Sequence, residues 1–398
     1  MRILQLCPKP PRPSRDGGCL AMDALTRGLL EDGHTVRLLV ICTEKHPHKP
    51  DELDPHYTSS TAYKSISVKT AINPIDAFSH LITGESYHIE RFNSPDFTRE
   101  LENILRDEVF DVIILESLFM TSYEHSIRRL SDADIVLRAH NVEHKIWSGL
   151  TEETKLGPKK WYLSKLTKQL KEYETSSINK FDAIIPICDE DAVNFKKIGA
   201  TIPIHVSPFG MDFEELPSSS TLATVDHVFH LGSMDWMPNL KGVDWLIEEV
   251  WPIVREQNSK VNLILAGRNM PDSYISNPSL GIQVLGEVEN ARDFLQRNGV
   301  MTVPIRTGSG MRVKAVEGMS AGRPTVSTEI GVSGLGLVNG EHVLIADTPE
   351  EFAKHILFLL SSPDKASNIA KSGQEHIRNK FSNKKIISDL VKFLEKLN

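Results

Sequence analysis

The chain has 398 residues, more than one hydrophobic core usually serves, so two domains of roughly 200 residues are expected. Its composition is globular, with 40% hydrophobic and 25% charged residues. The net charge of −8 argues against a general nucleic-acid-binding surface, which would be basic. No apolar run reaches about 18 residues, so we expect a cytoplasmic protein with at most peripheral contact to a membrane.

The chain shows no pattern for a metal or a disulfide framework. Its four cysteines are scattered and include no Cys-x-x-Cys pair. The tripeptides 132–134 and 189–191 have the outline of a metal-binding Asp-x-Asp. However, the first adjoins a buried strand, and in the second Asp189 is placed to cap a helix. No metal ion and no other cofactor are expected.

The first half of the chain repeats a strand–helix pattern. Residues 2–7 form an apolar run, residues 20–31 have helical periodicity that ends at Gly33, and residues 35–42 form a second apolar run. This β-α-β unit requires parallel strands joined by a crossover helix. Further apolar runs follow at residues 110–115, 134–138 and 181–187. We predict a Rossmann-like domain over residues 1–206.

The alternation is interrupted after residue 206 and then restarts. Residues 207–212 and the polar stretch 214–221 mark a weak domain boundary. Five apolar runs then predict the strands of a second parallel sheet, at residues 228–232, 261–267, 282–285, 300–303 and 325–327. We predict a second Rossmann-like domain over residues 207–375, followed by a terminal helix of about residues 376–398 that can pack back on the first domain. Residues 64–87 carry little specific signal.

The most informative local pattern lies at residues 307–327. It predicts a strand end, a glycine turn at residues 308–310, a helix, a glycine stop and another strand. A helix that begins at this turn directs unpaired N–H groups and its positive dipole end toward a ligand, which suits a phosphate. Arg312 and Lys314 would add positive charge. Glu317 would lie roughly 9 Å beyond the turn along the helix axis, where it could meet the hydroxyls of a sugar.

The alternative for this helix is an ordinary solvated face. Lys314 and Glu317 would then form an i, i+3 ion pair worth about 0.2 to 0.5 kcal/mol.

Taken together, these patterns resemble the GT-B fold glycosyltransferases of the large retaining family 4, group 1 type, which includes many bacterial polysaccharide and lipid-glycan enzymes. The resemblance covers nearly the whole chain. It is carried by Asp16-Gly17-Gly18 with Gly33-His34-x-Val36, residues 138–144, residues 207–212, Gly232 with residues 239–242, and residues 309–324. It implies an α/β protein of two facing Rossmann-like domains with parallel sheets and an interdomain cleft. The second domain would bind a nucleotide-sugar donor, and the first would bind the acceptor.

The resemblance also implies roles for individual residues. The residues implied in catalysis are His140, which would orient and polarise rather than attack, Glu317, which would hold ribose hydroxyls, and Lys241, a cation for the departing diphosphate. The residues implied in donor binding are Gly17, Gly18, Gly210, Gly232, Lys241, Gly308, Ser309, Gly310, Met311, Arg312, Lys314 and Glu317.

Two positions depart from the family pattern. The family signature is Glu-x7-Glu, and here Ser309 stands at the first position while Glu317 holds the second. Ser233 follows Gly232 where arginine is common. The pattern therefore supports nucleotide-sugar chemistry better than it identifies the sugar.

Several candidates have structural alternatives. Gly17 and Gly18 can form a turn that only needs positive φ. His140 can be a structural histidine, and His144 can be a surface helix residue. Glu143 is a weaker candidate for the site.

The basic segment 155–171 has two interpretations. It can lie on an anionic membrane and present a lipid-linked acceptor. Alternatively, it is a domain helix whose lysines are solvated and whose apolar residues are buried, namely Trp161, Leu163, Leu166 and Leu170.

The sequence therefore predicts a metal-independent, retaining glycosyltransferase of polysaccharide biosynthesis. It would move a hexose-type sugar from a nucleotide donor, with a UDP-sugar favoured, to a glycan or lipid-linked glycan. Retention through a front-face substitution is implied by the resemblance. Cytoplasmic or peripheral location at the inner membrane face is expected.

Three alternatives stay open. Ser309 and Ser233 suggest a donor-binding or scaffolding paralogue with weak activity, and a GT-B fold sugar-nucleotide epimerase is the second. An NAD-dependent oxidoreductase is disfavoured because Gly17-Gly18 is not a full Gly-x-Gly-x-x-Gly.

Overall fold

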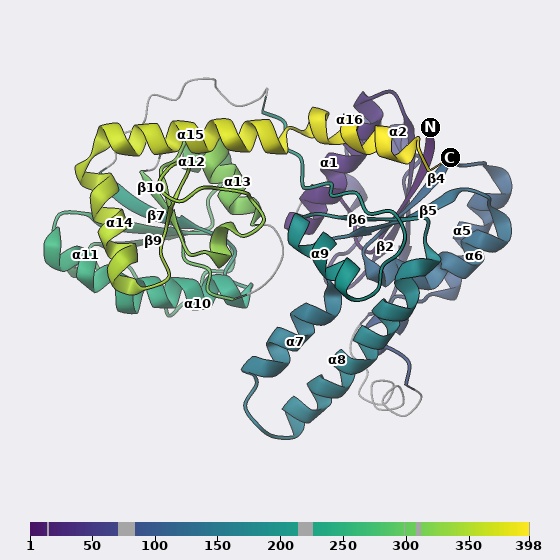
Figure 1. The fold of residues 1–398 in the computed structure, drawn as a ribbon, viewed down its shortest axis with the longest axis horizontal. Helices are drawn as coiled ribbons and strands as arrows, with labels where there is room; N and C mark the ends of the chain where they lie inside the picture. The colour runs from purple at the N-terminus through teal and green to yellow at the C-terminus, as the bar shows by residue number, and fades with distance from the viewer. Residues whose placement is uncertain (14–15, 71–83, 214–225, 298, 308–311, 398) are drawn as a thin grey trace. The chain divides into compact units, whose positions relative to one another are not determined.

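The chain folds into two compact units, each built on one parallel sheet (Figure 1). The computed structural model describes residues 1–13, 16–70, 84–213, 226–297, 299–307 and 312–397. One unit is formed by Met1–Gly210 with Asn383–Asn398, and the other by Met211–Ser382. The predicted α/β class with two Rossmann-like sheets is confirmed. The first unit extends to Gly210, where the sequence placed the boundary after residue 206.

The first unit has a six-stranded sheet in the order β3-β2-β1-β4-β5-β6. Its strands are β1 (Arg2–Cys7), β2 (Thr35–Cys42), β3 (Lys64–Ser67), β4 (Val112–Glu116), β5 (Asp134–Ala139) and β6 (Ala183–Pro186). Its helices are α1 (Gly17–Glu31), α2 (Pro55–Ser60), α4 (Tyr87–Glu90), α5 (Pro95–Asp107), α6 (Glu124–Leu130), α7 (Glu143–Glu153), α8 (Pro158–Ser177), α9 (Asp189–Lys197) and α16 (Asn383–Leu394).

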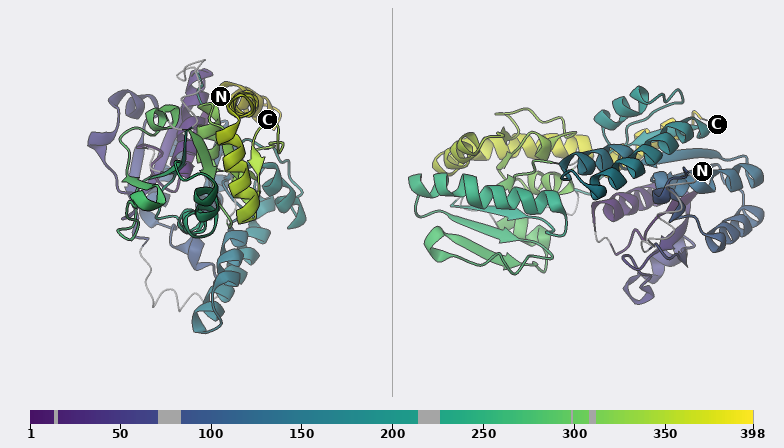
Figure 2. Two further views of the ribbon diagram at one scale, coloured as in Figure 1. Left: turned by 90° about the vertical axis from the view of Figure 1, so that its left-hand side faces the viewer. Right: turned by 90° about the horizontal axis from the view of Figure 1, so that it is seen from below.

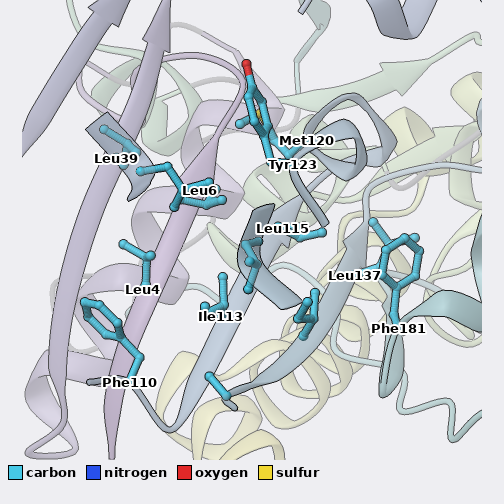
Figure 3. Close-up of a cluster of buried hydrophobic side chains, with 14 of the residues drawn as sticks. Leu4, Leu6, Leu39, Phe110, Ile113, Leu115, Met120, Tyr123, Leu137 and Phe181 are labelled. Atoms are coloured by element: carbon cyan, nitrogen blue, oxygen red, sulfur yellow. The ribbon is translucent and has the colours of Figure 1, made fainter. Parts of the chain in front are cut away.

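Side chains alternate along the buried strands and feed a core on each face of this sheet. On β1, Leu4 and Leu6 join the core shown in Figure 3, whereas Ile3 and Cys7 join the opposite core. Strands that are buried on both faces read as continuous apolar runs, which is why five of the six were predicted. The sixth, β3, is short and polar, and residues 64–67 gave no strand signal.

The C-terminal helix α16 packs against α1 in the first unit. A Cβ added at Gly28 of α1 would lie 2.4 Å from Ile387 Cγ1, so glycine allows the two helices to approach closely. Asn383 Nδ2 also donates to Ala24 O at 3.0 Å. The single terminal helix expected from the sequence is two helices, because α15 ends at Phe381 and α16 begins at Asn383.

The second unit has a six-stranded sheet in the order β12-β11-β10-β7-β8-β9. Its strands are β7 (His227–Leu231), β8 (Asn262–Ala266), β9 (Ile282–Gly286), β10 (Val300–Val303), β11 (Thr325–Ser327) and β12 (Leu344–Ile345). Its helices are α10 (Met237–Trp245), α11 (Trp251–Gln257), α12 (Ala291–Arg297), α13 (Val313–Ser320), α14 (Pro349–Ser361) and α15 (Pro363–Phe381).

This sheet also lies between two layers of helices (Figure 1). On β7, Val228 faces the core made with α10, α11 and α14, while Phe229 faces the core made with α12, α13 and α15. Each strand therefore presents its carboxyl end between helices on both sides. Strand β12 has only two residues and was not predicted.

Candidate functional site

Each sheet has a switch point where the chain reverses the direction in which it adds strands. It lies between β1 and β4 in the first unit and between β7 and β10 in the second. Doubly wound sheets bind ligands at the carboxyl ends of strands at such points. Among the predicted residues, Gly18 and His140 belong to the first of these regions. Gly232, Lys314 and Glu317 belong to the second.

In the first unit, His140 is held by a buried carboxylate. His140 Nε2 lies 2.6 Å from Glu116 Oε2. Arg138 Nη1 lies 3.2 Å from both oxygens of the same carboxylate, and Gln5 Nε2 donates to Oε1 at 2.7 Å. Glu116 and Arg138 are paired neighbours on β4 and β5, so the sheet register itself brings these two charges together.

The protonation of this group follows from its partners. Burial alone would raise the pKa of Glu116, but Arg138 and His140 hold it below its usual value. Because an ionised carboxylate can only accept, His140 Nε2 carries the proton of their hydrogen bond. The ring atom left for a ligand is Nδ1. The sequence analysis did not identify Glu116, although a glutamate at the end of an apolar strand is a signal that could have been used.

At the start of α1, Gly18 makes room for a lysine. Asp16 caps the helix by accepting from Cys19 N at 2.9 Å, and Lys9 Nζ donates to both oxygens of Asp16 at 2.7 Å. A Cβ at Gly18 would lie 3.0 Å from Lys9 Nζ. Neither Gly17 nor Gly18 has a positive φ, so the interpretation as a positive-φ turn is wrong. A ligand here would meet Lys9 and Asp16 rather than a fully free helix terminus.

The start of α7 holds a second buried acidic pair. Glu174 of α8 accepts the backbone N–H groups of Glu143 and His144 at 3.0 and 3.1 Å, and it lies 2.6 Å from His144 Nδ1. His144 is buried, so its interpretation as a surface residue is wrong. Burial, reinforced by Glu174, raises the pKa of Glu143 to about 8. Glu143 is therefore protonated at neutral pH.

In the second unit, α13 begins at Val313 and is preceded by Arg312 as its N-cap residue. The predicted helix is therefore present, and its first residue is Val313. Four predicted donor-site residues lie outside the described residues: Gly308, Ser309, Gly310 and Met311. The helix rests closely on β10, since a Cβ at Gly318 would lie 2.0 Å from Met301 Sδ.

Lys314 reaches from α13 to the first turn of α10. Its Nζ donates to Asn239 Oδ1, and Asn239 Nδ2 donates to Ser233 O at 2.7 Å. A Cβ at Gly232 would lie 3.0 Å from Asn239 Nδ2, so the glycine keeps this corner open. Burial lowers the pKa of Lys314 well below its usual value, and Arg312 lowers it further. A cation from α13 thus stands beside Ser233, where the family pattern has arginine.

Arg312 is buried and Glu317 is half-buried. The guanidinium carbon of Arg312 lies 5.1 Å from the centroid of the Trp236 ring. Burial raises the pKa of Glu317 to about 7, with Arg292 opposing the shift. The alternative of a solvated face is wrong for this helix, because Arg312 is buried and Lys314 bonds to Asn239 instead of Glu317.

A buried histidine completes this corner. His230 on β7 is fully buried, and its Nδ1 lies 3.0 Å from Thr302 O, a carbonyl that can only accept. Burial and the nearby Lys314 lower the pKa of His230 well below its usual value. The ring is therefore neutral with Nε2 as an acceptor, and the described residues offer this Nε2 no hydrogen-bond partner. The only sequence signal was a polar residue within an apolar strand.

The remaining predicted residues lie elsewhere in their units. Lys241 is exposed on α10. Gly210 is packed against Asn383, whose Oδ1 would lie 2.2 Å from an added Cβ, so its glycine has a packing reason. Within the described ranges, no group of three or more His, Cys, Asp or Glu side chains is placed to hold a metal ion.

The second unit also matches a known protein family. Residues 226–362 match the family model described as Glycosyl transferases group 1. The chain carries a group 1 glycosyltransferase domain. The enzyme is 24% identical to an uncharacterized 44.6 kDa protein in the cps region of Klebsiella pneumoniae, over 96% of its own length and 97% of that protein. It is 26% identical to an uncharacterized glycosyltransferase of Methanocaldococcus jannaschii over 40% of its own length and 45% of that protein.

Solved structures with the same architecture cover the whole enzyme. The Anabaena protein HepE, solved in complex with UDP, superposes with a TM-score of 0.69 at 13% identity over 100% of both chains. Sucrose-phosphate synthase from Thermosynechococcus elongatus superposes with a TM-score of 0.71 at 15% identity, over 100% of the enzyme and 99% of the synthase. The enzyme has the GT-B fold. Among its described helices, none is both long and apolar enough to cross a membrane.

Proposed function

We propose that the enzyme transfers a hexose-type sugar from a UDP-sugar to a glycan or lipid-linked glycan, with retention of the anomeric configuration and without a metal ion. The observation that carries this proposal is the corner around Gly232, where Lys314 and the acceptor nitrogen of His230 converge. His230 is fully buried and Lys314 is half-buried at the switch point of the second sheet.

The diphosphate is assigned to this corner. Transfer breaks the bond between the anomeric carbon and the phosphate oxygen, so negative charge develops on the departing diphosphate. A fixed cation in a water-poor site stabilises that charge far more than it would in solution. Lys314 supplies it, held by Asn239, and Lys241 and the glycine turn 308–310 are assigned as further donors.

Glu317 is assigned to the ribose hydroxyls. A carboxylate with a pKa near 7 is poorly solvated, so two hydroxyl donors would stabilise its charged form. Because α13 rises about 1.5 Å per residue, Glu317 lies roughly 4 to 5 Å beyond Lys314 along the helix axis. The two residues can therefore meet different parts of one nucleotide.

His140 is assigned to the transferred sugar. Its Nε2 is committed to Glu116, so Nδ1 can accept from a sugar or acceptor hydroxyl. In a front-face substitution the leaving phosphate takes the acceptor proton while the new glycosidic bond forms on the same face. His140 would then orient the hydroxyl and attack nothing.

The acceptor is assigned from the setting of a relative. The Klebsiella protein is described from the cps region, which favours a role in polysaccharide assembly for this enzyme too. A lipid-linked glycan would be presented at a membrane, so the proposal includes peripheral contact with an anionic bilayer from the cytoplasmic side.

The proposal is tested by donor turnover. We expect the wild type to be stabilised by a UDP-sugar in thermal unfolding, because a ligand that binds only the folded state raises its stability. It should also release UDP slowly by hydrolysis, and Glu317→Ala should lose most of this release. The control is Glu341→Ala, which removes an exposed carboxylate from the same unit.

Two outcomes would contradict the proposal. Nucleotide binding without turnover in any variant would favour a donor-binding paralogue. Conversion of the donor to an epimer in the absence of any acceptor would favour an epimerase.

A further inference from the structure

Helices α7 and α8 form a hairpin whose tip carries exposed apolar side chains. The two helices lie side by side and project from the first unit in Figure 1 and in the left view of Figure 2. The exposed fraction is 92% for Leu156 in the connecting turn, 64% for Trp161 on α8 and 47% for Leu150 on α7. Exposing a tryptophan and a leucine together is costly in water, so their position requires an explanation.

The hairpin packs against the rest of the first unit through other apolar residues. Leu163, Leu166 and Leu170 of α8 are buried. Leu166 packs with Tyr87, and Leu170 packs with Ile89 and Leu118 of the same unit. The predicted domain helix is thus confirmed for the three leucines and wrong for Trp161.

Trp161 lies on the opposite side of α8, in a basic stripe. Helical spacing places it above Lys165 and Lys168 at i+4 and i+7, and both lysines are exposed. The whole segment 155–171 contains six lysines and no Asp or Glu, in a chain whose net charge is −8. This segment therefore combines positive charge with exposed apolar side chains, whereas Glu152 and Glu153 precede it at the end of α7.

We propose that the tip of this hairpin docks on an anionic phospholipid bilayer, with Leu156 and Trp161 entering the headgroup region. Tryptophan favours the boundary between lipid and water, and lysines near an anionic surface contribute about 1 kcal/mol each. Lys155 and Lys159 flank the two apolar residues and are exposed. A shallow apolar anchor with surrounding lysines matches this boundary in both polarity and charge.

The hairpin also connects the docking tip to the first unit's candidate site. Glu174 near the far end of α8 caps the start of α7, beside Glu143 and His144. His140 lies just before that start. A bilayer at the tip would thus hold the first unit, which we propose binds the acceptor, at the membrane, with the start of α7 roughly 20 Å along the hairpin from Trp161. This last step rests on the proposed function, whereas the docking surface does not.

The test is co-flotation of the full chain with vesicles. We expect the wild type to float with phosphatidylglycerol-rich vesicles and to stay behind with pure phosphatidylcholine. The double variant Leu156→Ser/Trp161→Ser should lose at least about tenfold in partition to the anionic vesicles. Lys155→Gln/Lys159→Gln should show a smaller loss and a weaker dependence on salt, because surface charges are screened.

The control is Val109→Ser, which removes an apolar side chain that is 77% exposed elsewhere in the first unit. It should float like the wild type, and all variants should keep the wild-type thermal unfolding profile. Unchanged flotation of Leu156→Ser/Trp161→Ser would overturn the proposal. Equal binding of the wild type to both kinds of vesicle, or a Trp161-dependent dimer in solution, would also overturn it.

Measuring UDP-sugar hydrolysis in solution separates this inference from the proposed function. The tip variants should hydrolyse the donor at the wild-type rate. If hydrolysis is absent from every variant while flotation still depends on Trp161, the proposed function fails and the docking surface stands. The reverse pattern, with normal hydrolysis and no flotation, removes the docking surface alone.

Discussion

The switch-point clusters of the two units balance their charges in opposite ways. In the first, the carboxylate of Glu116 is paired with Arg138 and His140, and its pKa lies below the usual value. In the second, the pKa of Lys314 is lowered and that of Glu317 is raised, so each is shifted toward its uncharged form. The first cluster is a finished scaffold. The second would gain charge if a ligand stabilised the charged forms of Lys314 and Glu317.

The difference follows from the free-energy cost of burying a charged group. A buried charge is tolerated when a partner and hydrogen bonds replace water, and otherwise the group shifts its pKa and becomes neutral. An anionic diphosphate beside Lys314 would reverse that shift, as would hydroxyl donors at Glu317. We therefore propose that ligand binding charges the cluster of the second unit, whereas the ion pair of the first unit is present beforehand.

Breaking the balanced cluster should have the largest effect. Glu116→Gln leaves the guanidinium of Arg138 buried without its counter-charge, and removing one partner of a buried pair costs about 3–5 kcal/mol. Urea unfolding of the full chain should show this loss. It should also show little change for Glu108→Gln, whose carboxylate is partly exposed and pairs with Arg2 and Arg37, because such pairs are worth about 0–1 kcal/mol.

Similar losses in the two variants would mean that the cluster is not the tightly balanced scaffold inferred here. In that case the contrast between the two units would disappear.

Most strands were predictable from the sequence because they are largely buried on both faces. Runs such as residues 35–42 and 300–303 are mostly apolar and match β2 and β10 at both ends. Strands β3 and β12 lack that signal, since one is polar and the other has two residues. Local composition therefore predicted the sheet interiors but not the edges.

The candidate site was less predictable, because its contacts join distant segments. His140 was named from its motif, but its partner Glu116 comes from a neighbouring strand and meets it through the sheet register. Asn239 and Lys314 are likewise brought together by β7 and β10 lying side by side. Whether Trp161 was buried depended on which face of α8 packs, and several apolar faces were possible from spacing alone.

Removing the side chain of Lys314 should have the next largest effect. Lys314→Ala should reduce donor turnover by about 10²–10³-fold, as does loss of one fixed donor at a developing negative charge. The diphosphate should also raise the lowered pKa of Lys314, so wild-type UDP binding should take up protons at pH values where the lysine of the free protein is uncharged. Calorimetry in buffers of different ionisation enthalpy would measure this uptake.

The sign of the proton change distinguishes the two groups. Hydroxyl donors would lower the pKa of Glu317 from about 7, so that residue should release a proton on binding. Lys314→Ala should therefore show net release, Glu317→Gln should show net uptake, and the exposed control Lys354→Ala should match the wild type. Proton exchange that is the same in all four proteins would remove the claim that ligand binding charges this site.

The last effect concerns the first unit's exception, Glu143. Burial and Glu174 raise its pKa to about 8, so the folded state holds a proton that the unfolded chain loses near its usual pKa. The raised pKa costs no folding free energy at pH values below both pKa values, and the cost grows as the pH rises toward 8. Glu143→Gln removes this cost and should be more stable than the wild type by up to about 4 kcal/mol at pH 8, with little difference at pH 4. Denaturant unfolding across this range measures the gain, and Glu152→Gln, an exposed change on the same helix, should show none of it. If the stability difference between Glu143→Gln and the wild type did not change with pH, this carboxylate would be ionised and paired like Glu116. The contrast between the two units would then be complete.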